Sequence, residues 1–176
     1  EDIPAKLESV DWVFHLAGTN RPQCEDDFYT GNAVLTEMIA KAILASGRVI
    51  HVVFTSSIQV EAENSYGFSK RSAENALLQL KKDVGNEVYI YRLPNVFGKW
   101  ARPNYNSVVA TFCHNIARDI PIKINDPSAI IRLVYIDDVI SSFLDLLSGG
   151  DLGGSHKNTF SVDVGPEYSI TVGDLA

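Results

Sequence analysis

Tyr66 and Lys70 are the residues whose types and spacing first suggest chemistry, in the stretch NSYGFSKRSAENAL at residues 64–77. Residues four apart lie on one face of a helix. An ammonium beside a phenol favours the phenolate and lowers its pKa, so such a pair could exchange a proton with a bound molecule. An exposed pair on a helix surface has the same spacing, and Y-x-x-x-K is a weak pattern by itself. The surrounding elements must therefore decide between the two interpretations.

Three short apolar runs indicate the strands of a parallel sheet. They are VDWVFHLAG at 10–18, RVIHVVFTSS at 48–57 and EVYIYRLPN at 87–95. Each is nearly continuous in apolar residues, which is typical of strands buried on both faces. Helices are predicted between them at 26–46 and 66–84, ending at Gly47 and Gly85. The apolar positions expected to face the core are Val34, Met38, Ala42 and Ala45, and then Ala73, Leu77, Leu80 and Val84. This order of elements predicts a doubly wound parallel sheet.

The composition changes after Gly98, where KWARPNYNS is typical of a loop. We then expect a helix at 108–119, a short strand at 120–126, and a strand passing into a helix at 130–150. Asp137 and Asp138 are best explained as a helix start, since carboxylates favour the first turn. A short strand is predicted at 158–165 and the beginning of a helix at 169–176.

The carboxyl ends of the three predicted strands, HLAGTN, TSSIQ and RLPNVFG, carry small and polar residues. Ligands of open parallel sheets bind at these ends. The helix that contains Tyr66 begins shortly after Ser57. We therefore expect Ser57, Tyr66 and Lys70 to converge on one crevice.

Composition excludes several function classes. The chain of 176 residues is 45% hydrophobic and has a net charge of −7 without a basic run, which argues against nucleic acid and membrane surfaces as partners. No apolar run approaches the roughly 18 residues of a membrane span. Cys24 and Cys113 lie outside any C-x-x-C and are expected to be reduced, structural thiols of a cytoplasmic protein. The four histidines show no metal-ligand spacing, so no metal is expected.

Several motifs in order, VFHLAG, FTSS…YGFSK, YRLPNVFG and RLVYIDDV, resemble the extended short-chain dehydrogenase/reductases, the NAD-dependent epimerase/dehydratase family. The segment RLPNVFGKWARPNYNSVVATFCHNIARD and the short spacing from Ser57 to Tyr66 resemble its bacterial capsular-polysaccharide reductases. Those enzymes reduce a 4-keto sugar to UDP-2-acetamido-2,6-dideoxy-L-talose, and a cupin domain follows their reductase domain. The resemblance implies a cytoplasmic NAD(P)H-dependent reductase of a UDP-4-keto-6-deoxy-hexosamine.

The resemblance also implies the fold, an α/β Rossmann-like parallel sheet with helices on both faces. The family's first strand, glycine-rich G-x-x-G-x-x-G turn and helix have no counterpart here, so the amino-terminal half of the sheet is expected to be missing and the chain to be a fragment that is inactive alone. Residues 1–98 are expected to form the carboxy-terminal half of the dinucleotide-binding domain, and 99–176 a small α/β substrate-binding part.

The family's catalytic roles map onto Ser57, Tyr66 and Lys70. Tyr66 would give a proton to the carbonyl oxygen, and Ser57 would hold that oxygen. Lys70 would lower the pKa of Tyr66 and bind the nicotinamide ribose. Ser56 and Thr55 are alternatives to Ser57 as the oxygen ligand, although the resemblance favours Ser57.

Further residues are implied to bind the cofactor and the UDP-sugar. Beside the cofactor lie Leu16, Ala17, Gly18, Asn32, Thr55, Tyr66, Lys70, Pro94 and Val96. Asn95, Arg102 and Arg132 would bind the substrate, Arg132 through its diphosphate because a guanidinium matches phosphate in a bidentate fork. Ordinary alternatives remain: a strand exit at 16–18, helix capping for Asn32, a turn for Asn95, and surface positions for the two arginines.

Other functions within and outside the superfamily remain open. A nucleotide-sugar epimerase or dehydratase shares the fold, but a dehydratase usually has Thr-Asp-Glu where this chain has Ser57-Ile58-Gln59. A non-catalytic Rossmann-like relative is the alternative outside enzymes, and the intact Ser57, Tyr66 and Lys70 argue against it. The resemblance favours NADP over NAD and implies a homodimer formed through the two predicted helices.

Overall fold

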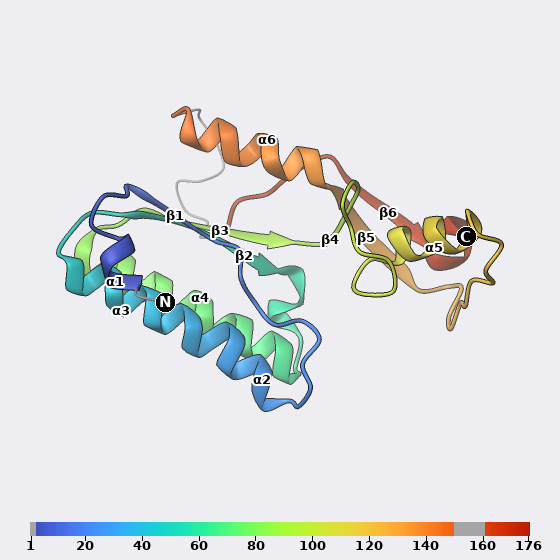
Figure 1. The fold of residues 1–176 in the computed structure, drawn as a ribbon, viewed down its shortest axis with the longest axis horizontal. Helices are drawn as coiled ribbons and strands as arrows, with labels where there is room; N and C mark the ends of the chain where they lie inside the picture. The colour runs from blue at the N-terminus through green and yellow to red at the C-terminus, as the bar shows by residue number, and fades with distance from the viewer. Residues whose placement is uncertain (1–2, 150–160) are drawn as a thin grey trace. The chain divides into compact units, whose positions relative to one another are not determined.

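A computed structural model describes residues 3–149 and 161–176 of the chain. This part forms two compact units, of which the first ends at Arg92 and the second begins at Leu93 (Figure 1). Val162 belongs to the first unit, and Asp163–Ala176 to the second. Along the chain, the boundary between the two units therefore lies a few residues before position 98, which is where the sequence predicts the boundary between the two functional parts.

The sheet of the first unit contains β1 (Trp12–His15), β2 (His51–Ser57) and β3 (Val88–Leu93), in that order. β1 and β2 are parallel, with Trp12 opposite His51 and His15 opposite Phe54. β3 runs in the same direction as β2 (Figure 1). Ser161 extends the sheet through a parallel bridge to Ile90 in β3. The predicted α/β fold with a parallel sheet is confirmed.

One long helical segment follows β1. It begins as α2 (Asp26–Phe28), continues as a π-helix, η1 (Tyr29–Val34), and ends as α3 (Leu35–Ser46). After β2 come a 3₁₀ turn, η2 (Ile58–Glu61), and α4 (Ser65–Val84), while a short α1 (Ile3–Lys6) precedes β1. Gly47 and Gly85 end α3 and α4 with φ of 64° and 73°, a left-handed conformation that glycine adopts without strain. Both predicted helix ends are therefore confirmed.

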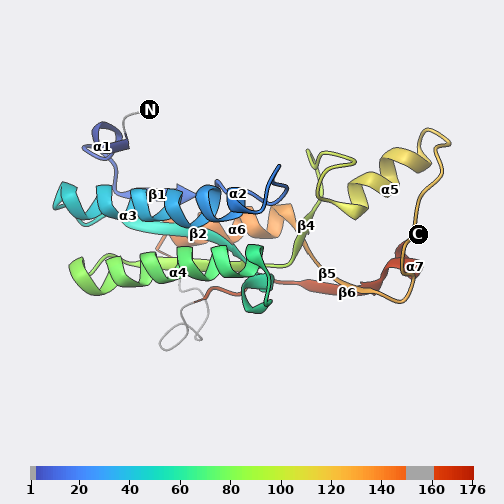
Figure 2. The ribbon, with the colours of Figure 1, turned by 90° about the horizontal axis from the view of Figure 1, so that it is seen from below.

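α3 and α4 lie side by side on the same face of the sheet (Figures 1 and 2). The core between them and the strands includes Ile43, Ile50, Phe54, Leu77 and Ile90, each at most 1% exposed. The predicted apolar side of α4 is confirmed. The predicted side of α3 is partly wrong, because Met38 is 54% exposed and Ala45 is also exposed, while Thr36, Ala40 and Ile43 are buried. The π-helix just before α3 adds a residue to one turn and so rotates the faces that follow it.

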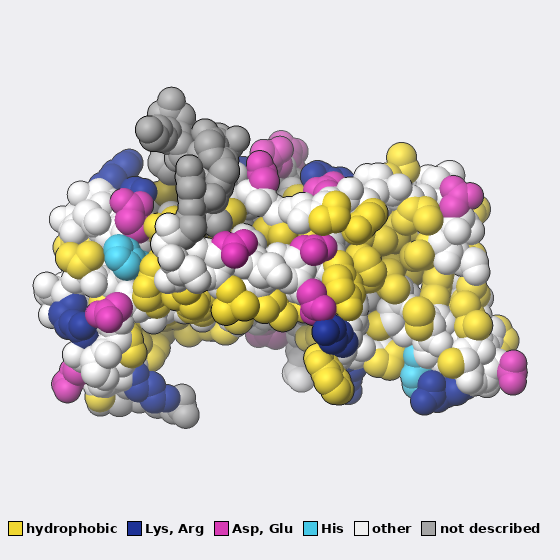
Figure 3. Space-filling model, turned by 90° about the horizontal axis from the view of Figure 1, so that it is seen from above, with side chains coloured by type: hydrophobic (Ala, Val, Ile, Leu, Met, Phe, Trp, Pro, Cys, Tyr) yellow, Lys and Arg dark blue, Asp and Glu magenta, His cyan; other side chains and the backbone are white. Residues whose placement is uncertain are grey.

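The second unit has its own sheet of β4 (Asn95–Phe97), β5 (Ile130–Tyr135) and β6 (Glu167–Thr171). β4 is parallel to β5, and β6 is antiparallel to it. The helices are α5 (Val108–Ile116), α6 (Ile136–Leu147) and α7 (Val172–Leu175). α6 exposes apolar side chains, with Ile140, Leu144 and Leu147 between 45% and 56% exposed. Figure 3 shows hydrophobic side chains, in yellow, on one face of the molecule.

Two predictions for the second unit are wrong. Residues 120–126 form no strand, and 169–171 belong to β6 instead of opening a helix, which starts only at Val172. Of the strand predicted at 158–165, residues 158–160 lie outside the described residues, and Ser161 makes a single bridge. Within the described residues, no helix is long and apolar enough to span a membrane.

Candidate active site

Ser57 and Tyr66 are neighbours at the carboxyl end of β2. Ser57 ends β2 in an extended conformation and begins η2, where its hydroxyl accepts a hydrogen bond of 3.1 Å from the Gln59 amide. Tyr66 lies in the first turn of α4, which Asn64 caps by accepting a bond of 2.8 Å from the Gly67 amide. The Ser57 side chain lies close enough to the Tyr66 phenol to lower its pKa. The predicted convergence of these two residues is therefore present in the structure.

Burial raises the pKa of Tyr66, and the Ser57 side chain opposes that effect only in part. This direction contradicts the prediction that Lys70 lowers the pKa of the phenol. The reason is the direction of the lysine, because Nζ of Lys70 donates to the Thr55 carbonyl at 3.1 Å and lies 4.9 Å from the ring centre of Phe54. Tyr66 is therefore a protonated phenol at neutral pH, the form that can donate a proton.

Lys70 is a buried ammonium, 6% exposed, on the same face of α4 as Tyr66. Burial lowers its pKa to about 8, against the opposing effect of the Glu74 carboxylate. Among the described residues, its hydrogen bond to Thr55 is the only one that Nζ donates. An ammonium has three N–H donors, so two remain for the hydroxyls of a bound molecule.

The chain passes close to Lys70 at Gly18. A Cβ added there would lie 2.7 Å from Oδ1 of Asn32 and 3.2 Å from Nζ of Lys70, so a larger residue would not fit without a shift. Leu16, Ala17 and Gly18 are all exposed. The end of β1 thus presents its backbone beside the lysine, which is the close approach that a glycine permits.

Asn32 holds the Gly18 segment against α4. Its side chain, 1% exposed, accepts from the Thr19 amide and donates to the Thr19 carbonyl, both at 2.9 Å, and donates to Ser69 Oγ at 3.0 Å. The capping alternative is therefore wrong, since Asn32 lies within the π-helix and caps no helix. A direct contact with the cofactor stays a prediction, while the hydrogen bonds show that Asn32 positions the loop.

The alternatives to Ser57 point elsewhere. Ser56 Oγ donates to Glu74 Oε1 at 2.5 Å, and Thr55 Oγ1 makes only a long contact of 3.5 Å with the His15 carbonyl. Alternate residues of a strand face opposite sides of the sheet, which separates Ser56 from Ser57. The structure therefore places Ser57, and neither alternative, against the Tyr66 phenol.

A buried polar cluster behind Lys70 was not predicted from the sequence. Glu74, 4% exposed, accepts from Ser56 and forms a bidentate pair with Arg92, at 3.1 Å to Nε and 2.7 Å to Nη2. His15, 3% exposed, lies 2.8 Å from Thr36 Oγ1 and stacks on Phe54. The one available signal was Glu74 itself, a carboxylate beside Ala73 and Leu77 in the predicted apolar side of α4.

The predicted substrate residues belong to the second unit. Asn95 donates to the Arg132 carbonyl at 3.2 Å, next to Pro94 and Val96. The Arg132 guanidinium forms a bidentate pair with Glu167, in which Nη2 lies 2.7 Å from Oε2. Arg102 lies over the Tyr105 ring at 5.7 Å. A diphosphate would therefore compete with Glu167 for Arg132, and the binding roles of these residues stay predictions.

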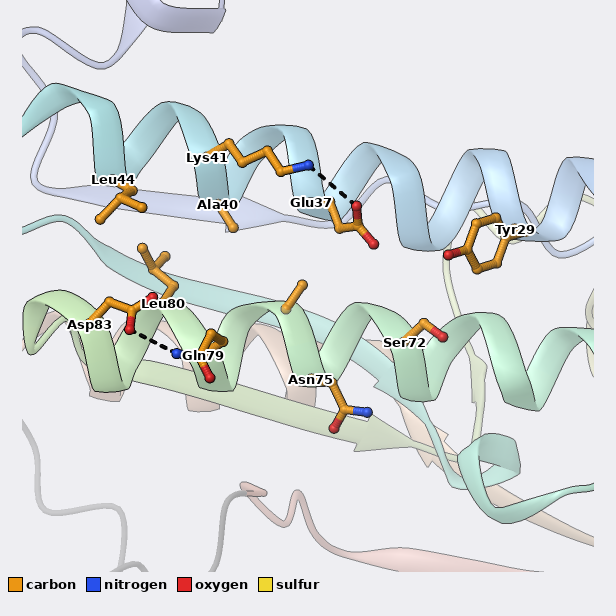
Figure 4. Close-up of a pocket in the computed structure, with 11 residues that line it drawn as sticks. Tyr29, Glu37, Ala40, Lys41, Leu44, Ser72, Asn75, Gln79, Leu80 and Asp83 are labelled. Atoms are coloured by element: carbon orange, nitrogen blue, oxygen red, sulfur yellow. Dashed lines mark hydrogen bonds and ion pairs between the residues drawn. The ribbon is translucent and has the colours of Figure 1, made fainter.

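A groove of about 530 Å³ lies elsewhere, between the outer sides of α3 and α4 (Figure 4). Its walls carry Tyr29, Ala40 and Leu44, together with an ion pair of Lys41 with Glu37 at 3.6 Å. None of the predicted site residues lines it. Over residues 3–149 and 161–176, no group of three His, Cys, Asp or Glu could hold a metal ion. Both cysteines are free and exposed, so the prediction that they are structural thiols of the core is wrong.

A model of the NAD dependent epimerase/dehydratase family matches residues 1–162. The chain belongs to this family. Over 175 residues it is 54% identical to a Pseudomonas aeruginosa protein named UDP-2-acetamido-2,6-beta-L-arabino-hexul-4-ose reductase, covering 99% of this chain and 46% of that protein. The family member described here thus spans about half the length of that curated relative.

Solved structures agree with this assignment. The capsular polysaccharide assembling protein CapF from Staphylococcus aureus matches with a TM-score of 0.82 and 35% identity, over 98% of this chain and 46% of that one. UDP-glucuronic acid 4-epimerase from Bacillus cereus, solved with NAD, matches with a TM-score of 0.79 over 98% and 59% of the chains. At 20% identity, the epimerase match supports the fold alone.

The residues present fit a nicotinamide dinucleotide. Gly18 leaves open the space that a Cβ would fill beside Lys70, and the Lys70 ammonium has two donors for ribose hydroxyls. The exposed segment 16–18 lies at the carboxyl end of β1, where dinucleotides bind in such sheets.

Proposed function

We propose that this chain carries the catalytic residues of an NAD(P)H-dependent reductase that acts on a UDP-4-keto-6-deoxy-hexosamine. The observation that carries the proposal is the arrangement of Ser57, Tyr66 and Lys70, with the Ser57 side chain beside the Tyr66 phenol and the ammonium one helical turn away. The name of the 54% identical relative supports the reduction of a 4-ulose.

The proposed chemistry is a reduction of the sugar carbonyl to an alcohol. The cofactor, when bound, supplies the hydride to the carbonyl carbon. Tyr66 donates its phenolic proton to the carbonyl oxygen, and the raised pKa of Tyr66 keeps that proton in place at neutral pH. Ser57, whose side chain lies beside the phenol, orients the same oxygen. The C=O double bond thus becomes a C–O single bond with one new C–H and one new O–H bond, which balances hydride and proton.

The cofactor and substrate assignments follow the family resemblance. Lys70 and the exposed segment 16–18 would bind the cofactor, with NADP favoured over NAD, and Asn32 would hold that segment in place. Thr55, Pro94 and Val96 are assigned to the nicotinamide side. Asn95, Arg102 and Arg132 would bind the UDP-sugar, Arg132 after release from Glu167.

A dehydratase is the less favoured activity of the same superfamily. After Ser57 the chain continues with Ile58 and the exposed Gln59, so the turn of η2 presents no acid at either position. The nearest carboxylate along this turn, Glu61, lies 3.7 Å from Arg92. The acid and base that a dehydration requires are therefore not supplied by η2.

A homodimer is proposed through the outer sides of α3 and α4. The groove there is flanked by Leu44, which is 45% exposed, while Tyr29 and Met38 are 44% and 54% exposed on the same helical segment. Exposed apolar side chains that line a groove mark interaction surfaces. We place the enzyme in the cytoplasm, where exposed free cysteines stay reduced, and in the synthesis of a surface polysaccharide, as the CapF match suggests.

The test is the rate of NADPH oxidation by the full-length protein with a UDP-2-acetamido-2,6-dideoxy-hexos-4-ulose. Tyr66→Phe should lower kcat about 10²- to 10⁴-fold, the contribution of a general acid, with the Kd of NADPH unchanged. Tyr29→Phe, at the groove, is the matched control and should keep the wild-type rate. Wild-type turnover by Tyr66→Phe would exclude Tyr66 as the acid, and inactivity of the wild type on every 4-keto nucleotide-sugar would favour a non-catalytic relative.

A further inference from the structure

Glu74 lies on the same side of α4 as the two catalytic residues. Tyr66, Lys70 and Glu74 follow one another at intervals of four residues, and positions so spaced form one stripe along a helix. Lys70 and Glu74 are 6% and 4% exposed. A buried carboxylate is costly unless it is paired and hydrogen-bonded, so its partners indicate what it does.

The Glu74 carboxylate joins three elements. Oε1 accepts from Ser56 on β2 at 2.5 Å and from Arg92 Nε on β3 at 3.1 Å, while Oε2 accepts from Arg92 Nη2 at 2.7 Å. A bidentate guanidinium pair and a short hydroxyl bond are the contacts of an ionised carboxylate. Ser56 directly precedes Ser57, so the same carboxylate fixes the strand end that carries the proposed oxygen ligand.

We propose that Glu74 is a positioning residue of the proposed reductase, whose buried negative charge keeps Lys70 an ammonium and whose hydrogen bond to Ser56 holds the end of β2 against α4. The proposal rests on the function proposed above. An ordinary ion pair between α4 and β3 would need only Arg92. The bond to Ser56 and the field at Lys70 are the additional features, since Glu74 opposes the effect of burial on the pKa of Lys70.

Other charges around Lys70 are weaker or more distant influences. His15 on β1 faces the ammonium and is itself kept neutral by burial and by Lys70, with its pKa lowered to about 4. Tyr66 lies one turn before Lys70 on α4, and its pKa is raised, while Arg71, Lys81, Lys82 and Asp83 are the other charged residues of this helix. Arg92 reaches the site through Glu74 and also lies 3.7 Å from Glu61. On the other elements packed against α4, Asp26 is exposed, Asp27 and His51 are half-buried, and Glu37 and Lys41 line the outer groove.

The test measures the titration of Lys70 by NMR of the full-length protein labelled with ¹³C at lysine Cε, with Lys70→Arg used to assign the signal. In Glu74→Gln, which keeps the shape but removes the charge, the midpoint should fall about one pH unit below the wild-type value. In Arg92→Gln, which leaves Glu74 without its opposing charge, the midpoint should rise by about half a pH unit. Glu61→Gln keeps the Glu74 charge and should leave the midpoint unchanged.

The Lys70 midpoint should shift in opposite directions in Glu74→Gln and Arg92→Gln, and this difference distinguishes an effect of charge from an effect of packing. If Glu74 and Arg92 only held the helix to the strand, losing either one would shift the midpoint in the same direction. An unchanged Lys70 midpoint in Glu74→Gln would overturn the proposal. If Glu74→Gln does not fold, a Lys70 midpoint in Arg92→Gln that lies below the wild-type value would overturn it instead. The measurement requires no substrate, so its failure is distinct from a failure of the reductase proposal. With substrate, Glu74→Gln should lose about fivefold in rate at about pH 8 and little at about pH 6.

Discussion

Replacement of His15 should remove most of the loss of stability that this protein shows on mild acidification. His15 is 3% exposed, and its Nε2 lies 2.8 Å from Thr36 Oγ1. The Thr36 hydroxyl donates to the Asn32 carbonyl at 2.6 Å, so Nε2 of His15 must be the protonated nitrogen that donates to Thr36. Burial and, to a smaller extent, Lys70 lower the pKa of His15 from 6.5 to about 4.

The sign and size of the effect follow from linkage. Between these two pKa values the unfolded chain binds a proton at His15 and the folded chain does not, so the stabilisation is complete above pH 6.5 and is lost as the pH falls toward 4. The full effect is about 3 kcal/mol, and about 1–2 kcal/mol of it is lost already at about pH 5.5.

The assay is urea unfolding of the wild type and of His15→Gln at about pH 7.5 and about pH 5.5. The glutamine amide can still donate to Thr36 but does not titrate. The free energy of unfolding of the wild type should fall by about 1–2 kcal/mol more than that of the variant. Comparison of the two proteins cancels the carboxylates that also titrate in acid. Equal losses in both proteins would show that His15 is not the group responsible.

Three further outcomes are expected. Gly18→Ala should destabilise the fold by about 1–3 kcal/mol and weaken NADPH binding, as measured by unfolding and fluorescence titration, and an unchanged Kd would remove Gly18 from the cofactor site. Arg132→Ala should raise the calorimetric Kd of the UDP-sugar about 10- to 100-fold, whereas Glu167→Gln, which frees the guanidinium, should lower it; equal affinities in both variants would leave Arg132 a surface residue. Leu44→Glu should convert a dimer to a monomer in light scattering, and Leu147→Glu, at a side chain of similar exposure, should not.

The fold of the first unit could be predicted because its local signals agree. β1, β2 and β3 lie within the predicted apolar runs, and Gly47 and Gly85 end the helices between them. The meeting of Ser57 and Tyr66 followed from a general property of parallel sheets. Where a strand end and the next helix are close in sequence, as they are here, the sequence pattern is enough to predict that their residues come together.

The remaining errors arise where long-range contacts decide. Glu74 has the side chain of a solvent-facing helix residue, and its partners Ser56 and Arg92 are each 18 residues away. Burial raises the pKa of Tyr66, while the Lys70 ammonium turns to the carbonyl of Thr55 on β2. The π-helix, η1, changes which residues of α3 are buried, and no residue pattern in the sequence predicts a π-helix there.

The reductase assignment is best decided by following the hydride. The full-length protein should be incubated with the UDP-4-keto-6-deoxy-hexosamine and NADPH deuterated at the transferred position, and the sugar product analysed by mass spectrometry and NMR. Net reduction predicts that each sugar product carries one deuterium at C4 and that one NADPH is oxidised per sugar. In Tyr66→Phe, both the deuterium incorporation and the NADPH oxidation should be lost. A converted sugar that carries no deuterium and consumes no NADPH would contradict a reductase and identify an epimerase or dehydratase instead.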